Sequence, residues 1–292
     1  MTTIVTVGGM TVYSAAVPDA GGVMRAFSIL KGWEGGGPVK GQSLERAQSD
    51  GAFAERAFRA GRTIVLGGVT ECPTRALAAA EALSLSALLG DGSFGDFVVD
   101  DPDMVTLRSS VRHGIEPMVE WDNHYMIEWQ FGFLAPDPLR YGDWVTASTG
   151  FLVVSGGLRF PLYSDGDGAD LGALDYGVSS TTGTLTLTNP GTATTPIQHV
   201  IAGPVDADGF DIINTATGRR LTYQGSIPTG SSLVLDGRTG AVLLDGQSER
   251  GTLLTSRDWP VCAAGASVSL FFRYRGGIAD GTLTSSLAPA YR

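Results

Sequence analysis

Hydrophobic and polar residues alternate along much of the chain, most clearly in its middle, within Val119 to Trp144. Bulky apolar residues occupy every second position from 127 to 133: Ile127, Trp129, Phe131 and Phe133. A period of two predicts a half-buried strand. The pattern stops at Pro136 and Pro138, which remove two N–H donors and push the preceding residues into extended backbone. We therefore expect the last core strand of one domain here, followed by a hinge. We interpret the end of this strand together with the hinge as an interdomain corner, a structural clamp between the two domains. Its residues are Trp129, Phe131, Phe133, Asp137, Pro138, Tyr141 and Trp144.

The residues before this corner predict short strands. Ile4 to Val7 and Met10 to Tyr13, separated by two glycines, indicate a hairpin. Arg62 to Leu66 predicts another strand, and residues 97–99 and 104–108 predict two more. The glycine-rich stretch from Gly21 to Gln42 lacks a phosphate-loop spacing and is expected to be a flexible surface loop.

One segment predicts a helix. Pro73 suits the first turn, Thr74 to Leu89 is rich in alanine and leucine, and Gly90 is expected to adopt the left-handed capping conformation. The helix leucines spread broadly around the axis, so much of the helix should be buried against a sheet or a neighbouring subunit. These leucines are Leu77, Leu83, Leu85 and Leu88.

Beyond Gly150, short strands recur about every ten residues, with Gly, Asp or Asn between them. Thr184 to Asn189 alternates cleanly, Ile197 to Ile201 follows, and Val268 to Tyr274 predicts a long core strand. Regular short strands predict a β-sandwich or jelly roll. Residues 280–292 are expected to form an extended tail.

The length of 292 residues and the change of pattern predict two domains, 1–148 and 149–292. The 41 glycines and 14 prolines favour tight turns, and 43% hydrophobic content provides a core. The expected fold class is mainly β: an N-terminal β-barrel-like domain with one helix and a C-terminal sandwich of jelly-roll or galectin-like type.

A formal net charge of −10 argues against binding to the nucleic-acid backbone, which requires clustered Lys and Arg. An acidic surface would also let DNA slide through a pore without adhering. Cys72 and Cys262 have neither metal-ligand nor disulfide spacing and are expected to be free, buried thiols. The N-terminus lacks the features of a signal peptide, and no stretch is apolar enough for a membrane span, so synthesis in a cytoplasm is expected.

The sequence offers little catalytic chemistry. His113, His124 and His199 show no zinc-protease spacing, and no nucleophile elbow is present. A carboxylate pair of the glycosidase type stays open, since acidic residues are abundant. We predict no catalytic residue, no cofactor and no enzymatic activity.

Two further sets of candidate residues have structural alternatives. The first set is a loop with the aspartates Asp165, Asp167 and Asp170. Oxygen ligands at alternating positions suit calcium, but the loop lacks the bidentate glutamate of an EF-hand. The alternative is a solvated polar loop without a metal. Aromatic residues on a sandwich stack on sugars when exposed and otherwise pack in the core. The glycan-stacking candidates are Tyr163, Tyr176 and Tyr223.

Several segments resemble the distal tail proteins of siphophages, the phages with long non-contractile tails. In the first domain these are RTIVLG before the helix and FGFLAPDPLRY at the corner. In the second they are TLTLTNPGTATTPIQHVIAGP, LVLDGRTGAVLLDG and WPVCAAGASVSLFFRY, in that order. The resemblance covers nearly the whole chain, although the loop from Gly21 to Gln42 has no firm counterpart.

The resemblance implies a virion structural protein that forms a hexameric ring between the tail tube and the tail-tip or baseplate complex, with a channel for DNA. It implies an N-terminal ring-forming (belt) domain and an outward C-terminal sandwich. The implied partners are further copies of the chain, the tail tube protein, the tail-tip hub protein, the tape measure protein and DNA that passes without specific binding. The implied location is the phage tail tip, after assembly in the host cytoplasm. The alternatives are a carbohydrate-binding adhesin or module that recognises host cell-wall glycans, and a secreted β-sandwich enzyme acting on polysaccharide.

Overall fold

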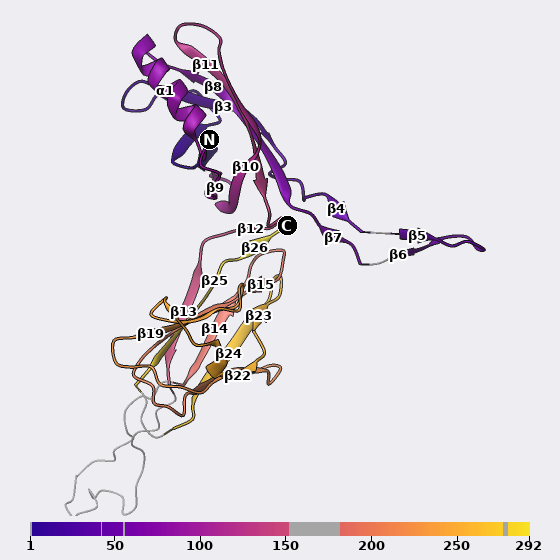
Figure 1. Cartoon of the computed structure of the whole chain (residues 1–292), viewed down its shortest axis with the longest axis vertical. Coiled ribbons are helices and arrows are strands. Elements are labelled where there is room, and N and C mark those ends of the chain that lie inside the picture. The colour runs from indigo at the N-terminus through magenta and orange to yellow at the C-terminus, as the bar shows by residue number, and fades with distance from the viewer. Residues whose placement is uncertain (1, 42, 55, 152–181, 277–279) are drawn as a thin grey trace, which may run out of the picture. The chain divides into compact units, whose positions relative to one another are not determined.

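The computed structural model describes residues 2–41, 43–54, 56–151, 182–276 and 280–292 (Figure 1). The chain divides into two compact units, Met1–Asp143 with Ala290–Arg292, and Trp144–Pro289. Strands dominate both units, and the described residues contain one α-helix. The prediction of a mainly β chain is confirmed.

The first unit is organised by a nine-stranded sheet with the order β11-β8-β3-β2-β1-β9-β10-β12-β26. Its strands are β1 (Ile4–Val7), β2 (Met10–Tyr13), β3 (Met24–Lys31), β8 (Arg62–Glu71), β9 (Gly95–Asp100), β10 (Leu107–Trp121), β11 (Met126–Ala135), β12 (Arg140–Tyr141) and β26 (Ala290–Tyr291). Because β10 also pairs with β11, the pairings from β11 through β3 and β9 to β10 form a closed circuit.

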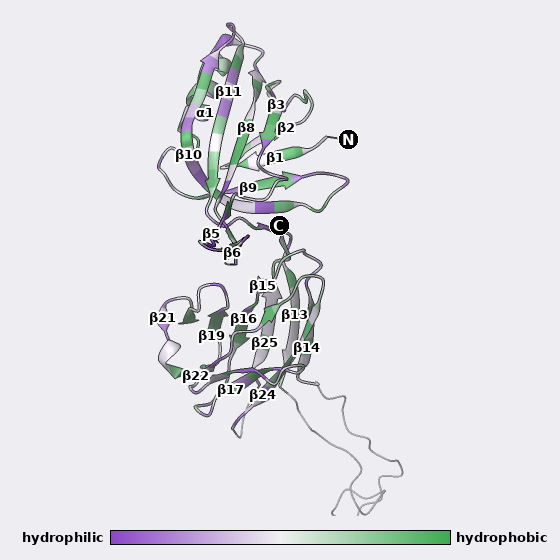
Figure 2. Ribbon diagram, turned by 90° about the vertical axis from the view of Figure 1, so that its right-hand side faces the viewer, coloured by the Kyte–Doolittle hydropathy of each residue, from purple (hydrophilic) through white to green (hydrophobic). Residues whose placement is uncertain are grey.

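The predicted core strand is β11, which pairs with β8 on one side and β10 on the other. Its hydrophobic and polar residues alternate (Figure 2). Trp129, Phe131 and Phe133 are each at most 1% exposed, with ring centroids 5.5 and 5.9 Å apart along the strand. Gly68 lies opposite Trp129, and a Cβ at Gly68 would lie 2.9 Å from the indole. The missing side chain makes room for the tryptophan.

Two strand predictions in this unit are wrong. Residues 24–31, predicted as part of a loop, form β3, which pairs with β8 at seven positions. Most residues of β3 are half-buried on both faces, so no alternation marks it. The strand predicted at residues 104–108 starts later, at Leu107, and runs to Trp121; Met104 and Val105 lie outside it and are exposed.

The helix α1 (Arg75–Ala87) begins after Thr74, whose hydroxyl accepts a hydrogen bond from the Leu77 amide. Gly90 does not adopt the left-handed capping conformation; Leu89 does, with φ of 46°. The side chain of Leu89 packs on the core, and a Cβ at Gly95 would lie 2.7 Å from it. This packing outweighs the local cost of a left-handed leucine.

Within the chain the helix is buried on one face only, and burial of its other faces against a neighbouring subunit stays a prediction. Ala78, Leu85 and the capping Leu88 are buried against the sheet, whereas Leu77 is 42% exposed and Leu83 74% exposed. Positions 78, 85 and 88 share one helix face. The chain itself therefore leaves Leu77 and Leu83 open.

A two-stranded extension leaves the sheet between β3 and β8; we call residues 39–59 the arm (Figure 1). The pair β4 (Val39–Lys40) and β7 (Phe58–Arg59) forms its base. The pair β5 (Ser43–Glu45) and β6 (Ala52–Ala54) forms its tip.

The second unit contains two antiparallel sheets around one hydrophobic core. The six-stranded sheet has the order β13 (Val145–Gly150), β25 (Thr282–Leu287), β16 (Gln198–Ala202), β19 (Ser232–Asp236), β20 (Val242–Leu244) and β21 (Ser248–Glu249). The five-stranded sheet has the order β14 (Thr184–Thr188), β24 (Ser267–Tyr274), β17 (Phe210–Asn214), β18 (Arg220–Tyr223) and β22 (Leu254–Arg257). A short pair, β15 (Thr195–Pro196) and β23 (Val261–Cys262), and the 3-10 helix η1 (Gly251–Leu253) complete the unit. The predicted β-sandwich is present; its jelly-roll or galectin-like type stays a prediction.

The end of the chain is not the extended tail predicted from the sequence. Residues 282–287 form β25, which lies between β13 and β16 in the six-stranded sheet. Residues 290–291 form β26, which pairs with β12 in the first unit's sheet. Leu283 and Leu287 are fully buried, so the segment is core.

Candidate functional site

The predicted interdomain corner separates into three environments. Trp129, Phe131 and Phe133 belong to the core of the first unit. Asp137 orders the turn that follows, because its carboxylate accepts hydrogen bonds from the Leu139 amide at 3.0 Å and the Tyr141 hydroxyl at 2.7 Å. Trp144 starts the second unit and is 56% exposed. The role of these residues as a clamp between domains stays a prediction.

A buried arginine that the sequence did not single out holds this turn. Arg62 is 1% exposed. It donates from Nε and Nη2 to the Pro138 carbonyl oxygen at 3.3 and 2.9 Å, and from Nη1 to the carbonyl oxygens of Gly32 and Trp33. Burial, followed by the nearby Arg140 charge, lowers the pKa of Arg62. Arg62 therefore ties three loop carbonyls to the start of β8.

A second arginine joins the turn to the end of the chain. Arg140 is 6% exposed and lies over the Trp33 ring, 5.5 Å from its centroid. It donates to Glu34 at 3.1 Å and to the carbonyl oxygen of Arg292 at 2.9 Å. Since β12 pairs with β26 here, Arg140 fixes the chain terminus within the first unit.

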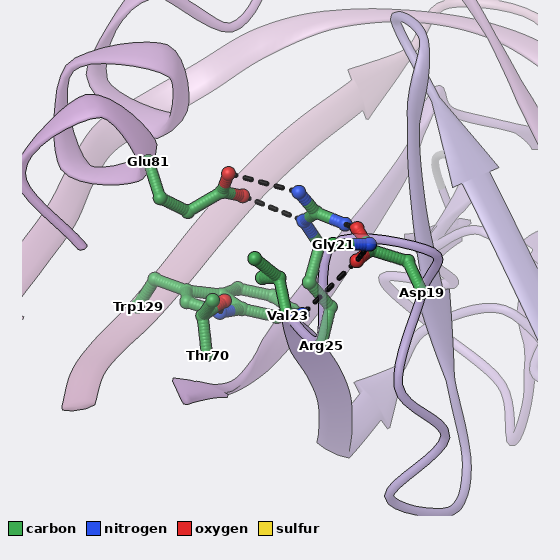
Figure 3. A network of polar contacts seen from close by, with 7 residues as sticks. All are labelled: Asp19, Gly21, Val23, Arg25, Thr70, Glu81 and Trp129. Atoms are coloured by element: carbon green, nitrogen blue, oxygen red, sulfur yellow. Dashed lines mark hydrogen bonds and ion pairs between the residues drawn. The ribbon is translucent and has the colours of Figure 1, made fainter. Parts of the chain in front are cut away.

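A charged network lies beneath the helix (Figure 3). Arg25 on β3 donates from Nε and Nη2 to Glu81 on α1 at 2.6 and 2.9 Å, and from Nη1 to Asp19 at 2.9 Å. Hydrogen bonds from Val23 first, and then from Arg25, lower the pKa of Asp19. A bidentate pair from strand to helix fixes the orientation of the helix. Two carboxylates face one guanidinium, which leaves an excess negative charge.

This network borders a cavity of about 610 Å³ between α1 and β2, which we call the helix cleft. Apart from one bridge at Tyr13, β2 and β3 are not paired, so the sheet opens beside the helix. The cleft is lined by residues of three kinds. Its polar wall holds Asp19, Arg25, Glu81 and Ser84; its apolar wall holds Met10, Leu85, Leu88 and Leu89; and its rim holds Gly8 and Gly9.

The arm carries apolar residues that the first unit does not cover. Leu44 and Phe53 lie directly opposite each other at the tip and are 74% and 62% exposed. At the base, Val39 and Phe58 are 68% and 60% exposed. Isolated exposed apolar residues are ordinary, but several on one thin extension mark an interaction surface.

The three histidines lie on different elements. His113 on β10 contacts the Leu88 carbonyl oxygen through Nε2 at 2.5 Å. His124 lies in the turn between β10 and β11. His199 on β16 is fully buried, with Nδ1 2.8 Å from the Ser285 hydroxyl and no partner at Nε2 among the described residues. It is therefore a core histidine.

We expect His199 to make the second unit sensitive to acid. Burial lowers the pKa of His199 from 6.5 to about 3. Between these two pH values the imidazole is therefore protonated in the unfolded chain and neutral in the folded chain. The contribution of the neutral imidazole to the free energy of unfolding is fully present above pH 6.5 and is lost progressively as the pH falls toward 3. Between pH 8 and 5 the free energy of unfolding should fall by about 2 kcal/mol.

Urea unfolding of the second unit at several pH values measures this slope. The double variant His199→Leu with Ser285→Ala removes both partners of the buried hydrogen bond and should flatten the slope over that range. An NMR titration of the wild-type imidazole provides an independent check, since His199 should stay neutral at pH 5. Protonation of His199 near pH 6.5 in the folded protein would refute the assignment.

The remaining candidate residues contribute no site to the described structure. Asp165, Asp167 and Asp170, together with Tyr163 and Tyr176, lie outside the described residues. Tyr223 is fully buried against Phe210, with ring centroids 5.4 Å apart, so it is not a surface for glycan stacking. Its inward position on β18 favours packing over contact with a ligand.

The described residues offer neither a metal site of the usual kind nor a membrane-spanning helix. They include no cluster of three or more His, Cys, Asp or Glu suited to a metal. Within the same ranges, no helix is long and apolar enough to cross a membrane. Cys72 and Cys262 are free and buried, and burial raises the pKa of both thiols.

Comparison with known proteins gives matches only among solved structures. No family model matches the chain, and no curated protein matches it. The SPP1 Dit (gp 19.1) protein, described as a paradigm of the hub adsorption apparatus in phages that infect Gram-positive bacteria, matches with a TM-score of 0.66 and 12% identity over 99% of both chains.

Chains of the phage P2 baseplate in its activated conformation also match. The structure with Ca has a TM-score of 0.55 and 7% identity over 98% of both chains. The structure with Sr has a TM-score of 0.51 and 8% identity over 97% of both chains. The resemblance drawn from the sequence is thus confirmed at the level of the fold: along its whole length, the chain has the fold of phage Dit and baseplate hub proteins.

Proposed function

We propose that the chain is a distal tail protein of a siphophage, a structural part of the virion at the tail tip. The observation that carries this proposal is the likeness to SPP1 Dit over 99% of both chains, which includes both units. Motifs in the sequence support it independently, since corner and helix segments resemble the same family. By this proposal the protein works through its surfaces and catalyses no reaction.

The N-terminal unit, by this proposal, forms a hexameric ring that joins the tail tube to the tail-tip complex. The exposed apolar residues of the arm support a role in subunit contacts. An arm that binds a different surface of the next copy makes a heterologous contact, and such contacts generate a closed ring when the rotation between neighbours closes. Tail tube, tail-tip hub and tape measure proteins would be its partners.

The acidic composition supports a channel that DNA traverses without adhering. The formal net charge is −10, and DNA-binding surfaces require the opposite sign. The C-terminal sandwich would lie outside the ring as a decoration or attachment domain. A glycan-binding function for this sandwich receives no support from Tyr223, which is buried.

Light scattering on the purified chain tests the proposal. A ring of six copies has six times the chain mass of 30.4 kDa. We expect this mass at micromolar concentration, with little change in high salt because apolar contacts dominate. A stable monomer across the concentration range would contradict the proposed function.

A further inference from the structure

The arm tip presents an apolar face that requires a partner. Leu44 and Phe53 form a directly opposed cross-strand pair, and both are mostly exposed. The guanidinium of Arg46 lies 5.0 Å from the Phe53 ring centroid, a contact that leaves much of the ring open. Covering apolar surface is worth about 25 cal/mol per Å², so burial of this pair on a partner is favourable.

The charge of the arm indicates what kind of partner it fits. Residues 39–59 contain four basic and three acidic residues, a net charge of +1, so the rest of the chain carries −11. Three of these cations, Lys40, Arg56 and Arg59, lie outside the tip, whereas residues 43–54 carry Arg46 together with Glu45 and Asp50, so Arg46 is the group at the tip that can complement a carboxylate of another copy. Opposite charge steers association and helps select the partner.

The helix cleft has the chemistry to receive the arm tip. Its volume of about 610 Å³ lies within the range of about 300–1,000 Å³ typical of ligand sites. Met10, Leu88 and Leu89 supply an apolar wall. Asp19 and Glu81 supply two carboxylates against the single charge of Arg25, and Asp19 is 38% exposed at its side chain. The site therefore suits an apolar group with a cation beside it.

We propose that the Leu44–Phe53 face of one copy's arm occupies the helix cleft of the next copy, with Arg46 beside Asp19. The inference rests on the proposed ring function and identifies the surface that receives the arm. The donor and the acceptor are different surfaces of one chain, so each copy binds one neighbour and is bound by another. Repetition of this contact closes the ring.

Disulfide trapping between two co-expressed variants tests whether the arm tip of one copy occupies the helix cleft of the next. One carries Leu44→Cys at the arm tip, and the other carries Ser84→Cys in the cleft and a size tag. A bond between the two is necessarily intermolecular, and it requires Cα atoms within about 7 Å. The native Cys72 and Cys262 are 3% and 1% exposed and should contribute little background.

The matched control replaces Ser84→Cys with Leu83→Cys, the adjacent helix residue that is 74% exposed and does not line the cleft. We expect several-fold more heterodimer with the cleft cysteine than with the control. If rings form but the two cysteine positions give equal amounts of heterodimer, the proposed arm–cleft contact is wrong, while the proposed ring function still holds. A chain that stays monomeric and gives no cross-link would overturn both the seating and the proposed function.

Discussion

Removing the arm is expected to convert the ring to monomers without unfolding the chain. The cut is best placed between Val39 and Arg59, which face each other at the arm base, with an Asn-Gly turn joining them. This link keeps the hydrogen bond from the Ala60 amide to the Pro38 carbonyl at 2.7 Å. The arm's exposed side chains contribute little to the core, so the monomer should stay folded, and its thermal midpoint should fall only by the share that assembly contributes.

Light scattering and thermal unfolding together measure this result. A finer variant, Leu44→Ser with Phe53→Ser, removes only the apolar face and should weaken assembly in the same direction. The control Val261→Ser removes a 52% exposed apolar residue from the second unit and should leave the ring mass unchanged. A truncated chain that still assembles would show that the arm is not a ring contact.

The second large effect is expected at Arg62. Arg62→Met keeps most of the apolar stem but leaves the carbonyl oxygens of Pro138, Gly32 and Trp33 without their donor. Each buried unsatisfied group costs about 1–3 kcal/mol, so we expect a loss of on the order of 3–5 kcal/mol in the stability of the first unit.

Urea unfolding followed by tryptophan fluorescence checks this value. Arg59→Met is the matched control, since it makes the same change of side chain at an exposed site and should change stability by less than about 0.5 kcal/mol. The transition of the second unit, which lacks Arg62, should be unchanged in both variants. A loss below about 1 kcal/mol for Arg62→Met would contradict the role assigned to this arginine.

Strands with one buried face were predictable from the sequence. The hairpin of β1 and β2, the alternation in β11 and the positions of β14 and β24 all follow from period-two patterns and turn residues. Successive side chains of such a strand point either to the core or to solvent, so the alternation of apolar and polar residues is sufficient to predict the strand.

The errors occurred where tertiary contacts outweigh local preference. Strand β3 carries no alternation because both of its faces are half-buried. Leu89 takes the left-handed conformation ahead of Gly90 because its side chain packs on the core. The C-terminal β25 was missed since TLTSSL, rich in Thr and Ser, does not look like a central strand until its two neighbours are known.

The surfaces that we propose for assembly were less predictable than the fold. The corner residues were identified by their motif, but Arg62, which holds the corner turn, belongs to a different segment and only the fold brings it there. The arm lies partly inside the stretch that was expected to be a loop. Its exposed apolar residues form one face only because the strand register places Leu44 opposite Phe53, and the sequence does not reveal that register. The helix cleft requires three separate segments, so no local pattern marks it.

The central claim is that this chain acts by assembling with copies of itself. Electron microscopy of the purified protein, with end-on views averaged without imposed symmetry, tests it most directly. We expect closed rings of six copies around an open centre. Isolated two-lobed particles at all concentrations, with no rings, would contradict it.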